Sequence, residues 1–454
     1  MLIERNVGPI DATHTTLGHI REIPRVAYLS SYPPRECGIA TFCEDLVTST
    51  LLVSRAVEPS VIAMETNGRV RQYAWPVTAI VREDIEEEYE LAADVINESQ
   101  ADVVSIQHEF GIFGGVESQR LFKFFDRIRK PVVTTLHTVL PRPGPAILEN
   151  LREIGRRSKR LVIMNSLAAE ILRDDYGIDS GKIALIHHGA LPPSLEVMEK
   201  AKARLGLSGR RVMSTFGLVA RGKGLEYAIR ALPAVLKRHP ELCYVIVGRT
   251  HPGVQRIERE SYREELTRIV AECGVQDSVR FVNRYVSKAE VVCYLAATDL
   301  YITPYLSPDQ ITSGTLAYAL AAGRCVISTP YLYARFLLAE GRGLLVDFRS
   351  DTSIAEAVNS VLDTPDLQAV LQRRARRYGQ RMYWPAVAAN YLKLFDDVAR
   401  ERTANAKRLS TDLQLSLPRY TEGKIRDDIE GSRPTAIAGS SAKADGLLRH
   451  HTAR

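Results

Sequence analysis

The sequence predicts an α/β protein built from two Rossmann-like, doubly wound parallel-sheet domains. Short runs of β-branched and apolar residues recur along the chain, and amphipathic segments of helix length separate them. This alternation is typical of βαβ units whose parallel sheet is buried on both faces. The pattern also starts afresh near the middle of the chain, which indicates a second domain of the same class.

Six runs in each half of the chain are predicted as strands, and those of the first half are each followed by a loop that contains Gly, His or Pro. The strands of the first half cover residues 25–30, 60–64, 102–107, 131–136, 160–164 and 183–187. Those of the second half cover residues 211–216, 243–247, 278–282, 300–303, 325–328 and 343–346. Helices of the second half are expected to begin near Gly224, Arg256, Lys288, Ser313 and Asp351.

The predicted elements divide the chain into two domains with a segment outside them at each end. Residues 1–24 are expected to form an N-terminal extension, residues 25–190 the N-terminal domain and residues 191–385 the C-terminal domain. A helix over residues 386–399 would return to the first domain, and residues 400–454, which lack apolar periodicity, are expected to form a disordered tail. Because ligands of such sheets bind beyond the carboxyl ends of the strands, the two domains should face a central cleft.

The composition is that of a globular enzyme. Hydrophobic residues make up 45% of the chain and charged residues 25%, and the formal net charge of +6 is compatible with phosphate-bearing ligands or an acidic membrane surface. No dense block of Lys and Arg indicates a nucleic acid partner, and no run approaches the roughly 20 apolar residues that span a bilayer. We therefore expect a cytoplasmic protein that at most docks onto the cytoplasmic face of a membrane, and no oligomeric state is predicted.

The six cysteines have neither CxxC spacing nor a neighbouring His pair. Reduced thiols are therefore expected, without a zinc site or a disulfide framework. No cofactor is expected, and no carboxylate cluster of the DxD type is placed to hold a catalytic metal.

The most informative segment is the loop from Gly217 to Gly224, which follows a predicted strand and opens a helix. A glycine-bearing turn of this kind lets the backbone approach a phosphate, and the helix N-terminus supplies unpaired N–H groups with a partial positive charge. Arg221 and Lys223 add full charges. The loop therefore predicts a phosphate or diphosphate site, which we favour over an ordinary turn with two solvated basic residues.

At this loop the sequence resembles the GT-B glycosyltransferases, specifically the large retaining family four, whose second domain carries G-x5-K-G. Gly217, Lys223 and Gly224 match that motif, and residues 298–305 and 322–329 match two further strand motifs of the family. The arginine that usually follows the first glycine is Leu218 here, so Arg221 would supply the second charge. The resemblance extends over residues 25–399.

The donor-binding loop departs from the family at its pair of glutamates eight residues apart. Those positions hold Gln310 and Tyr318, and a shift of one residue also finds no glutamate. In their place Ser313, Gly314 and Thr315 open a helix with two hydroxyl groups, suited both to cap the helix and to bind phosphate oxygens or sugar hydroxyls. This turn resembles the S-G-T turn of the α-glucan phosphorylases, which share the GT-B architecture.

In the first domain, the resemblance assigns Gly38, after the first strand, to the loop beside donor phosphate and acceptor. A simple turn glycine is about as well supported by the residues alone. His137 matches the family's histidine beside the donor sugar. His108 and Glu109 end another predicted strand and are candidate acceptor contacts. His188 and His251 also lie beyond strand ends and carry less weight.

The resemblance implies a metal-independent glycosyltransferase that retains anomeric configuration and needs no protein nucleophile. Its partners would be a nucleotide-sugar donor, or a sugar phosphate, and an acceptor that is a sugar, glycan or lipid-linked glycan. The missing glutamates keep a glycoside phosphorylase of the same fold as the main alternative. A nucleotide-sugar epimerase and an inactive binding protein are further alternatives, and the intact Lys223 motif argues against the inactive one.

Overall fold

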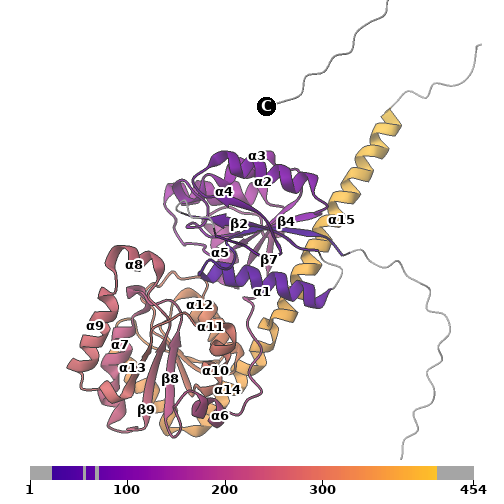
Figure 1. Cartoon of the computed structure of the whole chain (residues 1–454). Coiled ribbons are helices and arrows are strands. Elements are labelled where there is room, and N and C mark those ends of the chain that lie inside the picture. Colours follow the sequence, from indigo (N-terminus) through magenta and orange to yellow (C-terminus); the bar gives the residue numbers. More distant parts are fainter. Residues whose placement is uncertain (1–22, 55–57, 67–70, 417–454) are drawn as a thin grey trace, which may run out of the picture. The chain divides into compact units, whose positions relative to one another are not determined.

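The computed structural model describes residues 23–54, 58–66 and 71–416. Both sheets lie in one compact unit that ends at Ala404. Figure 1 shows the succession of strands and helices along the chain. The predicted N-terminal extension, apart from its last residues, and the end of the predicted tail lie outside the described residues.

The first sheet has seven parallel strands in the order β3-β2-β1-β4-β5-β6-β7. Its strands are β1 (Val26–Ser30), β2 (Ser60–Glu65), β3 (Val77–Arg82), β4 (Val103–His108), β5 (Val132–Leu136), β6 (Arg160–Ile163) and β7 (Ile183–Leu185). The second sheet has six parallel strands in the order β10-β9-β8-β11-β12-β13. These are β8 (Arg211–Phe216), β9 (Leu242–Val247), β10 (Val279–Val282), β11 (Leu300–Thr303), β12 (Cys325–Ser328) and β13 (Leu344–Leu345).

The predicted fold class is confirmed, because both sheets are parallel and reverse direction of winding at a switch point. That point lies between β1 and β4 in the first sheet and between β8 and β11 in the second, where ligands of doubly wound sheets bind. Every predicted strand is present, with ends shifted by at most two residues. Strands β1, β4 and β9 are buried along their whole length, which explains their continuous apolar runs.

Helices connect the strands. In the first domain they are α1 (Gly38–Val53), α2 (Glu86–Glu98), α3 (Leu121–Arg127), α4 (Pro145–Arg157) and α5 (Ser166–Asp174). The second domain contains α6 (Met198–Arg204), α7 (Leu225–Leu236), α8 (Pro252–Glu258), α9 (Ser261–Glu272), α10 (Lys288–Ala297), α11 (Gly314–Ala321), α12 (Leu332–Leu337), α13 (Asp351–Asp363) and α14 (Pro365–Gly379). Helices α7, α9 and α13 pack together and share one core with the second sheet (Figure 1).

The last helix, α15 (Trp384–Ser416), is longer than predicted. Residues 400–416, expected to be disordered, continue this helix, because the segment contains neither Gly nor Pro and is rich in good helix formers. Glu401 on this helix pairs with both Lys159 and Arg160 of the first domain. Residues 417–454 of the predicted tail lie outside the described residues.

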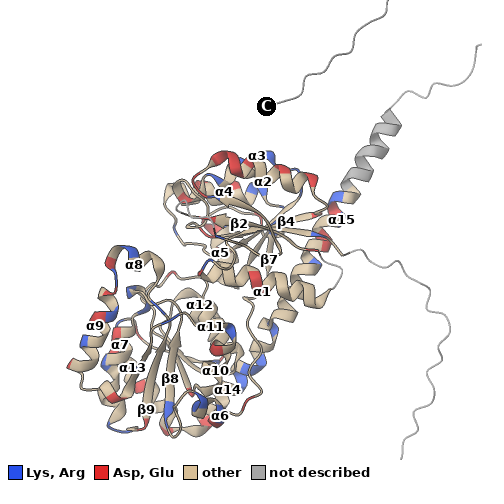
Figure 2. Cartoon of the chain, in the orientation of Figure 1, with Lys and Arg blue, Asp and Glu red and all other residues tan. Residues whose placement is uncertain are grey.

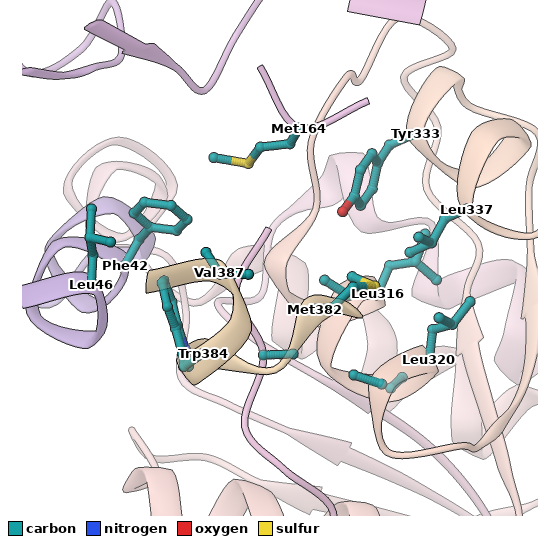
Figure 3. Close-up of a cluster of buried hydrophobic side chains, with 14 of the residues drawn as sticks. Phe42, Leu46, Met164, Leu316, Leu320, Tyr333, Leu337, Met382, Trp384 and Val387 are labelled. Atoms are coloured by element: carbon teal, nitrogen blue, oxygen red, sulfur yellow. The ribbon is translucent and has the colours of Figure 1, made fainter. Parts of the chain in front are cut away.

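A single hydrophobic cluster contains side chains from both domains and from α15 (Figure 3). Phe42 on α1 packs edge-on against Trp384 at the start of α15, with ring centroids 5.1 Å apart. The two chain segments that cross between the domains meet beside it, where the backbone N–H of Trp384 donates to the Ala190 carbonyl at 3.1 Å. The cluster therefore joins the two sheets through buried apolar contacts.

Candidate functional site

The loop after β8 is held against the loops after β9 and β11 by close backbone contacts. Gly224 has a positive φ of 62°, and a Cβ there would lie 2.1 Å from the Pro304 carbonyl oxygen. A Cβ at Gly248, which follows β9, would lie 2.0 Å from the carbonyl oxygen of Gly217. Only glycine fits at these two positions, so three strand ends meet in one tightly packed rim.

Lys223 lies on this rim with its ammonium group over an aromatic ring. Its Nζ is 3.8 Å from the centroid of the Tyr305 ring, a cation–π contact. The Tyr305 hydroxyl lies 2.9 Å from Thr315 Oγ1, and its ring stacks on Tyr331 with centroids 5.3 Å apart. Within the described part of the chain no carboxylate forms an ion pair with Lys223, so its charge is available to a ligand.

Tyr305 itself is fully buried. Burial raises the pKa of its phenol, but the Lys223 ammonium and the hydrogen bonds of the cluster outweigh it, so the pKa of Tyr305 is lowered. Tyr305 falls within the strand motif at residues 298–305, but its position beneath Lys223 was not predicted. An aromatic residue two positions after the carboxyl end of β11 was the available signal.

Arg221 points to a different set of partners from those predicted. Its Nε lies 2.8 Å from Glu258 Oε2, a second nitrogen pairs with Glu265, and its guanidinium lies 5.2 Å from the centroid of the Tyr262 ring. The sequence predicted Arg221 as the second charge at the phosphate, and these contacts give it protein partners instead. Two carboxylates of α8 and α9 already balance this charge.

The start of α7 also differs from the expected cradle of unpaired N–H groups. The first N–H of the helix, that of Leu225, donates to the Tyr262 hydroxyl at 3.2 Å. That hydroxyl in turn donates to Glu226. The helix N-terminus is thus partly satisfied within the protein, and the positive charge of the site rests mainly on side chains.

The predicted S-G-T turn begins α11. Ser313 Oγ caps the helix by accepting from the Leu316 N–H at 3.4 Å, while Thr315 contacts Tyr305. Gly314 lies against a histidine, since a Cβ there would be 3.0 Å from His188 Nε2. Capping is thus observed, and the hydroxyl of Thr315 belongs to the same cluster as Lys223.

The two positions that lack glutamates are engaged in internal contacts. The Tyr318 hydroxyl donates to Asp45 Oδ2 of α1 at 2.9 Å, and Lys288 pairs with the other oxygen of Asp45. Gln310 donates from its amide to the Thr312 carbonyl at 3.0 Å. Burial, with Asp45 beside it, raises the pKa of Tyr318 well above its ordinary value. Tyr318 is therefore part of a contact between the two domains.

His108, expected to project into the cleft, is fully buried instead. Its ring lies 5.1 Å from that of Phe110 and 5.9 Å from that of Phe113, and neither ring nitrogen has a hydrogen-bond partner among the described residues. His108 is the last residue of β4, which is buried along its whole length, so its side chain lies in the core. A direct acceptor contact by His108 is not compatible with this position.

Glu109 and His137 directly follow β4 and β5, which are neighbouring strands of the first sheet. Glu109 accepts hydrogen bonds from the Thr138 hydroxyl at 2.7 Å and from the Phe110 N–H at 3.0 Å, and burial raises its pKa. His137 Nε2 lies 3.0 Å from Gln107 Oε1, and burial lowers the pKa of His137 well below its ordinary value. Burial therefore favours the neutral form of the His137 imidazole.

The buried histidines make the stability of the fold depend on pH. Burial lowers the pKa of His108 to about 3 and that of His188 to about 4. The unfolded chain binds these protons below about pH 6.5 and the folded chain does not, so the free energy of unfolding falls as pH decreases from 6.5 to 4. Each such histidine contributes up to about 1.4 kcal/mol per pH unit.

His108→Leu is the test, because it removes one buried titrating group that makes no hydrogen bond. We expect the slope of unfolding free energy against pH, measured by urea denaturation between pH 4.5 and 6.5, to decrease by the equivalent of about one proton. An unchanged slope would mean that His108 is charged in the folded protein.

Gly38 is the first residue of α1 and is exposed, with nothing within 4 Å of the position of a Cβ. The residues around it contact the second domain. Glu36 pairs with Arg249, and the Thr41 hydroxyl lies 3.4 Å from that of Tyr285. Gly38 therefore borders open space beside a contact between the loops after β1 and β9.

Metal clusters and membrane-spanning helices are both absent from the described residues. No group of three or more His, Cys, Asp or Glu side chains is arranged there to hold a metal ion. No helix in the same residues is long and apolar enough to cross a membrane. Figure 2 shows acidic and basic residues, in red and blue, interspersed along helices such as α9.

Two family models match the chain. The model described as Glycosyltransferase Family 4 matches residues 38–190, and the model described as Glycosyl transferases group 1 matches residues 197–378. Together they match well over half of the chain. The chain therefore belongs to the group 1 glycosyltransferases, a family of transferase enzymes, and has their GT-B fold.

Curated relatives are similar over part of their length. D-inositol 3-phosphate glycosyltransferase of Streptomyces avermitilis is 25% identical over 57% of this chain and 58% of its own length. Phosphatidyl-myo-inositol mannosyltransferase of Mycolicibacterium smegmatis is 26% identical over 39% of this chain and 42% of its own length. The match thus spans about half the length of these relatives.

Solved structures share the fold over most of this chain. Anabaena HepE in complex with UDP and glucose has a TM-score of 0.66 at 15% identity and covers 82% of this chain and 100% of its own. Sucrose-phosphate synthase from Thermosynechococcus elongatus has a TM-score of 0.65 at 17% identity, with 84% and 100% covered.

Proposed function

We propose that this chain transfers a glycosyl residue from a nucleoside diphosphate sugar to a carbohydrate acceptor. The observation that carries the proposal is the Lys223 ammonium, which is free of carboxylate partners within the described residues and rests 3.8 Å from the Tyr305 ring centroid at the carboxyl end of the second sheet. This cation would neutralise charge that develops on the leaving diphosphate. The solved HepE complex with UDP and glucose supports a donor of this class.

Retention of configuration and independence of metal ions belong to the same proposal. Lys223 would supply the positive charge that a divalent cation supplies in other transferases, while the exposed Gly38 leaves room for phosphate or acceptor beside α1. His137 would contact the donor sugar as a neutral hydrogen-bonding group, since its pKa is lowered by burial. Glu109, His137 and Ser313 are the proposed polar contacts of the bound sugars.

A glycoside phosphorylase of the same fold is the second candidate, and one observation favours it. Tyr318, at a position where the family carries a ribose-binding glutamate, donates its hydroxyl to Asp45 instead. A ribose would therefore have to be held without that carboxylate, whereas inorganic phosphate would need only Lys223 and the hydroxyl groups of the S-G-T turn.

A thermal-shift screen separates the two candidates. We expect UDP, GDP or ADP at millimolar concentration to raise the melting temperature, and the shift to be the same in the presence of EDTA. Stabilisation by inorganic phosphate with a sugar, and by no nucleotide, would contradict the transferase proposal. Loss of the nucleotide shift with EDTA would contradict its metal independence.

A further inference from the structure

We infer that Arg249 supplies the second positive charge at the donor diphosphate, from the loop after β9. The inference rests on the proposed transferase function and assigns a new residue to it. Leu218 stands where the family's motif has arginine, and Arg221 is balanced by Glu258 and Glu265. Of the two predicted charges, that of Lys223 is thus the one without a carboxylate partner in the described residues. Arg249, which has one such partner instead of two, would supply the second charge.

Backbone hydrogen bonds tie Arg249 to the loop that carries Lys223. The Val219 N–H donates to the Arg249 carbonyl at 2.9 Å, and the His251 N–H donates to the Val219 carbonyl at 2.9 Å. Gly248, directly before Arg249, packs on Gly217 so closely that no side chain fits there. The two loops therefore form one unit, and Arg249 extends from the same rim as Lys223.

The side chain of Arg249 points to the first domain. Its guanidinium pairs with Glu36, which lies two residues before Gly38 in the loop after β1. The side chain is 37% exposed, and its buried Nε has no hydrogen-bond partner among the described residues. A guanidinium has five N–H donors, and this one keeps at least one donor that no protein group among the described residues accepts.

The surroundings leave Arg249 room to change partner. A cavity of about 350 Å³ borders it, and the one carboxylate in the wall of that cavity, Glu260, pairs with Arg263. Glu36 is therefore the carboxylate that neutralises Arg249 in the absence of donor. A diphosphate carries more charge than one carboxylate and accepts bidentate hydrogen bonds from arginine, so it would displace Glu36.

This exchange predicts opposite effects for the two members of the pair. Arg249→Ala should raise the Kd of the nucleoside diphosphate at least tenfold, and Arg249→Lys should raise it less. Glu36→Gln removes the competing carboxylate and should lower the Kd two- to fivefold. If Arg249 only tied the domains together, both substitutions would break the same contact and shift the Kd in the same direction.

The measurement is calorimetric titration with UDP, GDP and ADP, at one salt concentration, on variants whose melting curves are cooperative. Arg268→Ala, an exposed change on α9, is the matched control for loss of one positive charge and should leave the Kd within twofold. Equal Kd values for wild type and Arg249→Ala would overturn the inference alone. A wild-type protein that binds none of the three nucleotides would overturn the proposed function and the inference with it.

Should Arg249→Ala fail to fold, the comparison of Arg249→Lys with Glu36→Gln remains. Both keep a polar side chain at the contact between the loops, so neither leaves a cavity. A raised Kd in the first and a lowered Kd in the second would support the inference, and changes of the same sign would overturn it.

Discussion

Replacing Lys223 with alanine is expected to lower kcat at least tenfold and to leave the fold intact. The Lys223 ammonium contacts the Tyr305 ring and has no carboxylate partner within the described residues, so a negatively charged ligand is its strongest available partner. A charge-assisted interaction is worth about 1.5–3 kcal/mol, which corresponds to about ten- to a hundredfold in rate when it acts in the transition state. Steady-state kinetics with the true donor measures the effect.

Two variants serve as controls for this result. Tyr305→Phe keeps the ring beneath the ammonium and removes only the hydroxyl that contacts Thr315, so its kcat should fall less than that of Lys223→Ala. Arg221→Ala should also have the smaller effect, because Glu258 and Glu265 already balance its charge. Wild-type turnover in Lys223→Ala would remove the basis for the phosphate site.

The alternation of strands and helices was readable from the sequence because the central strands of both sheets, such as β1, β4, β8 and β9, are buried along all or nearly all of their length. The prediction missed β3, which lies at the edge of the first sheet. Only Val81 of that strand is buried, and Thr78 and Arg82 interrupt its apolar run. A strand at the edge of a sheet is less buried and so needs fewer apolar residues. The sequence of β3 could therefore not be distinguished from that of a loop.

The backbone of the site was predictable, whereas the directions of its charged side chains were not. Gly217 and Gly224 mark a turn in the sequence because their backbone conformation requires glycine. The orientation of Arg221 depends on Glu258 and Glu265, more than 35 residues along the chain. The partner of Arg249 lies in the other domain. Such contacts are set by tertiary packing, which a motif does not encode.

Tyr318→Glu is expected to destabilise the protein strongly. The Tyr318 hydroxyl donates to the buried Asp45, so the substitution places two carboxyl groups side by side at a contact between the domains. Burial already raises the pKa of Asp45, against the lowering effects of Lys288 and Tyr318. A second buried carboxylate should reduce the free energy of unfolding by about 3 kcal/mol, whereas Tyr318→Phe should cost about 1 kcal/mol.

The double variant Asp45→Asn with Tyr318→Glu removes the repulsion and so tests this account. An asparagine amide can donate to the new carboxylate, so the double variant should recover most of the unfolding free energy lost in Tyr318→Glu, as measured by urea denaturation. If the two single effects simply add, Asp45 and Tyr318 do not interact in the way the 2.9 Å contact indicates.

The same double variant separates a nucleotide site from a phosphate site. In a transferase, the new carboxylate restores the bidentate acceptor for the ribose hydroxyls, so nucleoside diphosphates should bind more tightly than to wild type. In a phosphorylase no ribose enters, and the double variant moves one carboxylate from position 45 to position 318 without changing the net charge, so phosphate binding should change little. Titrations of wild type and double variant with UDP, GDP, ADP and inorganic phosphate therefore distinguish the two functions, because only a transferase should gain nucleotide affinity. Binding of phosphate without any nucleotide binding in either protein would contradict a nucleotide-sugar donor and leave only the fold and the family.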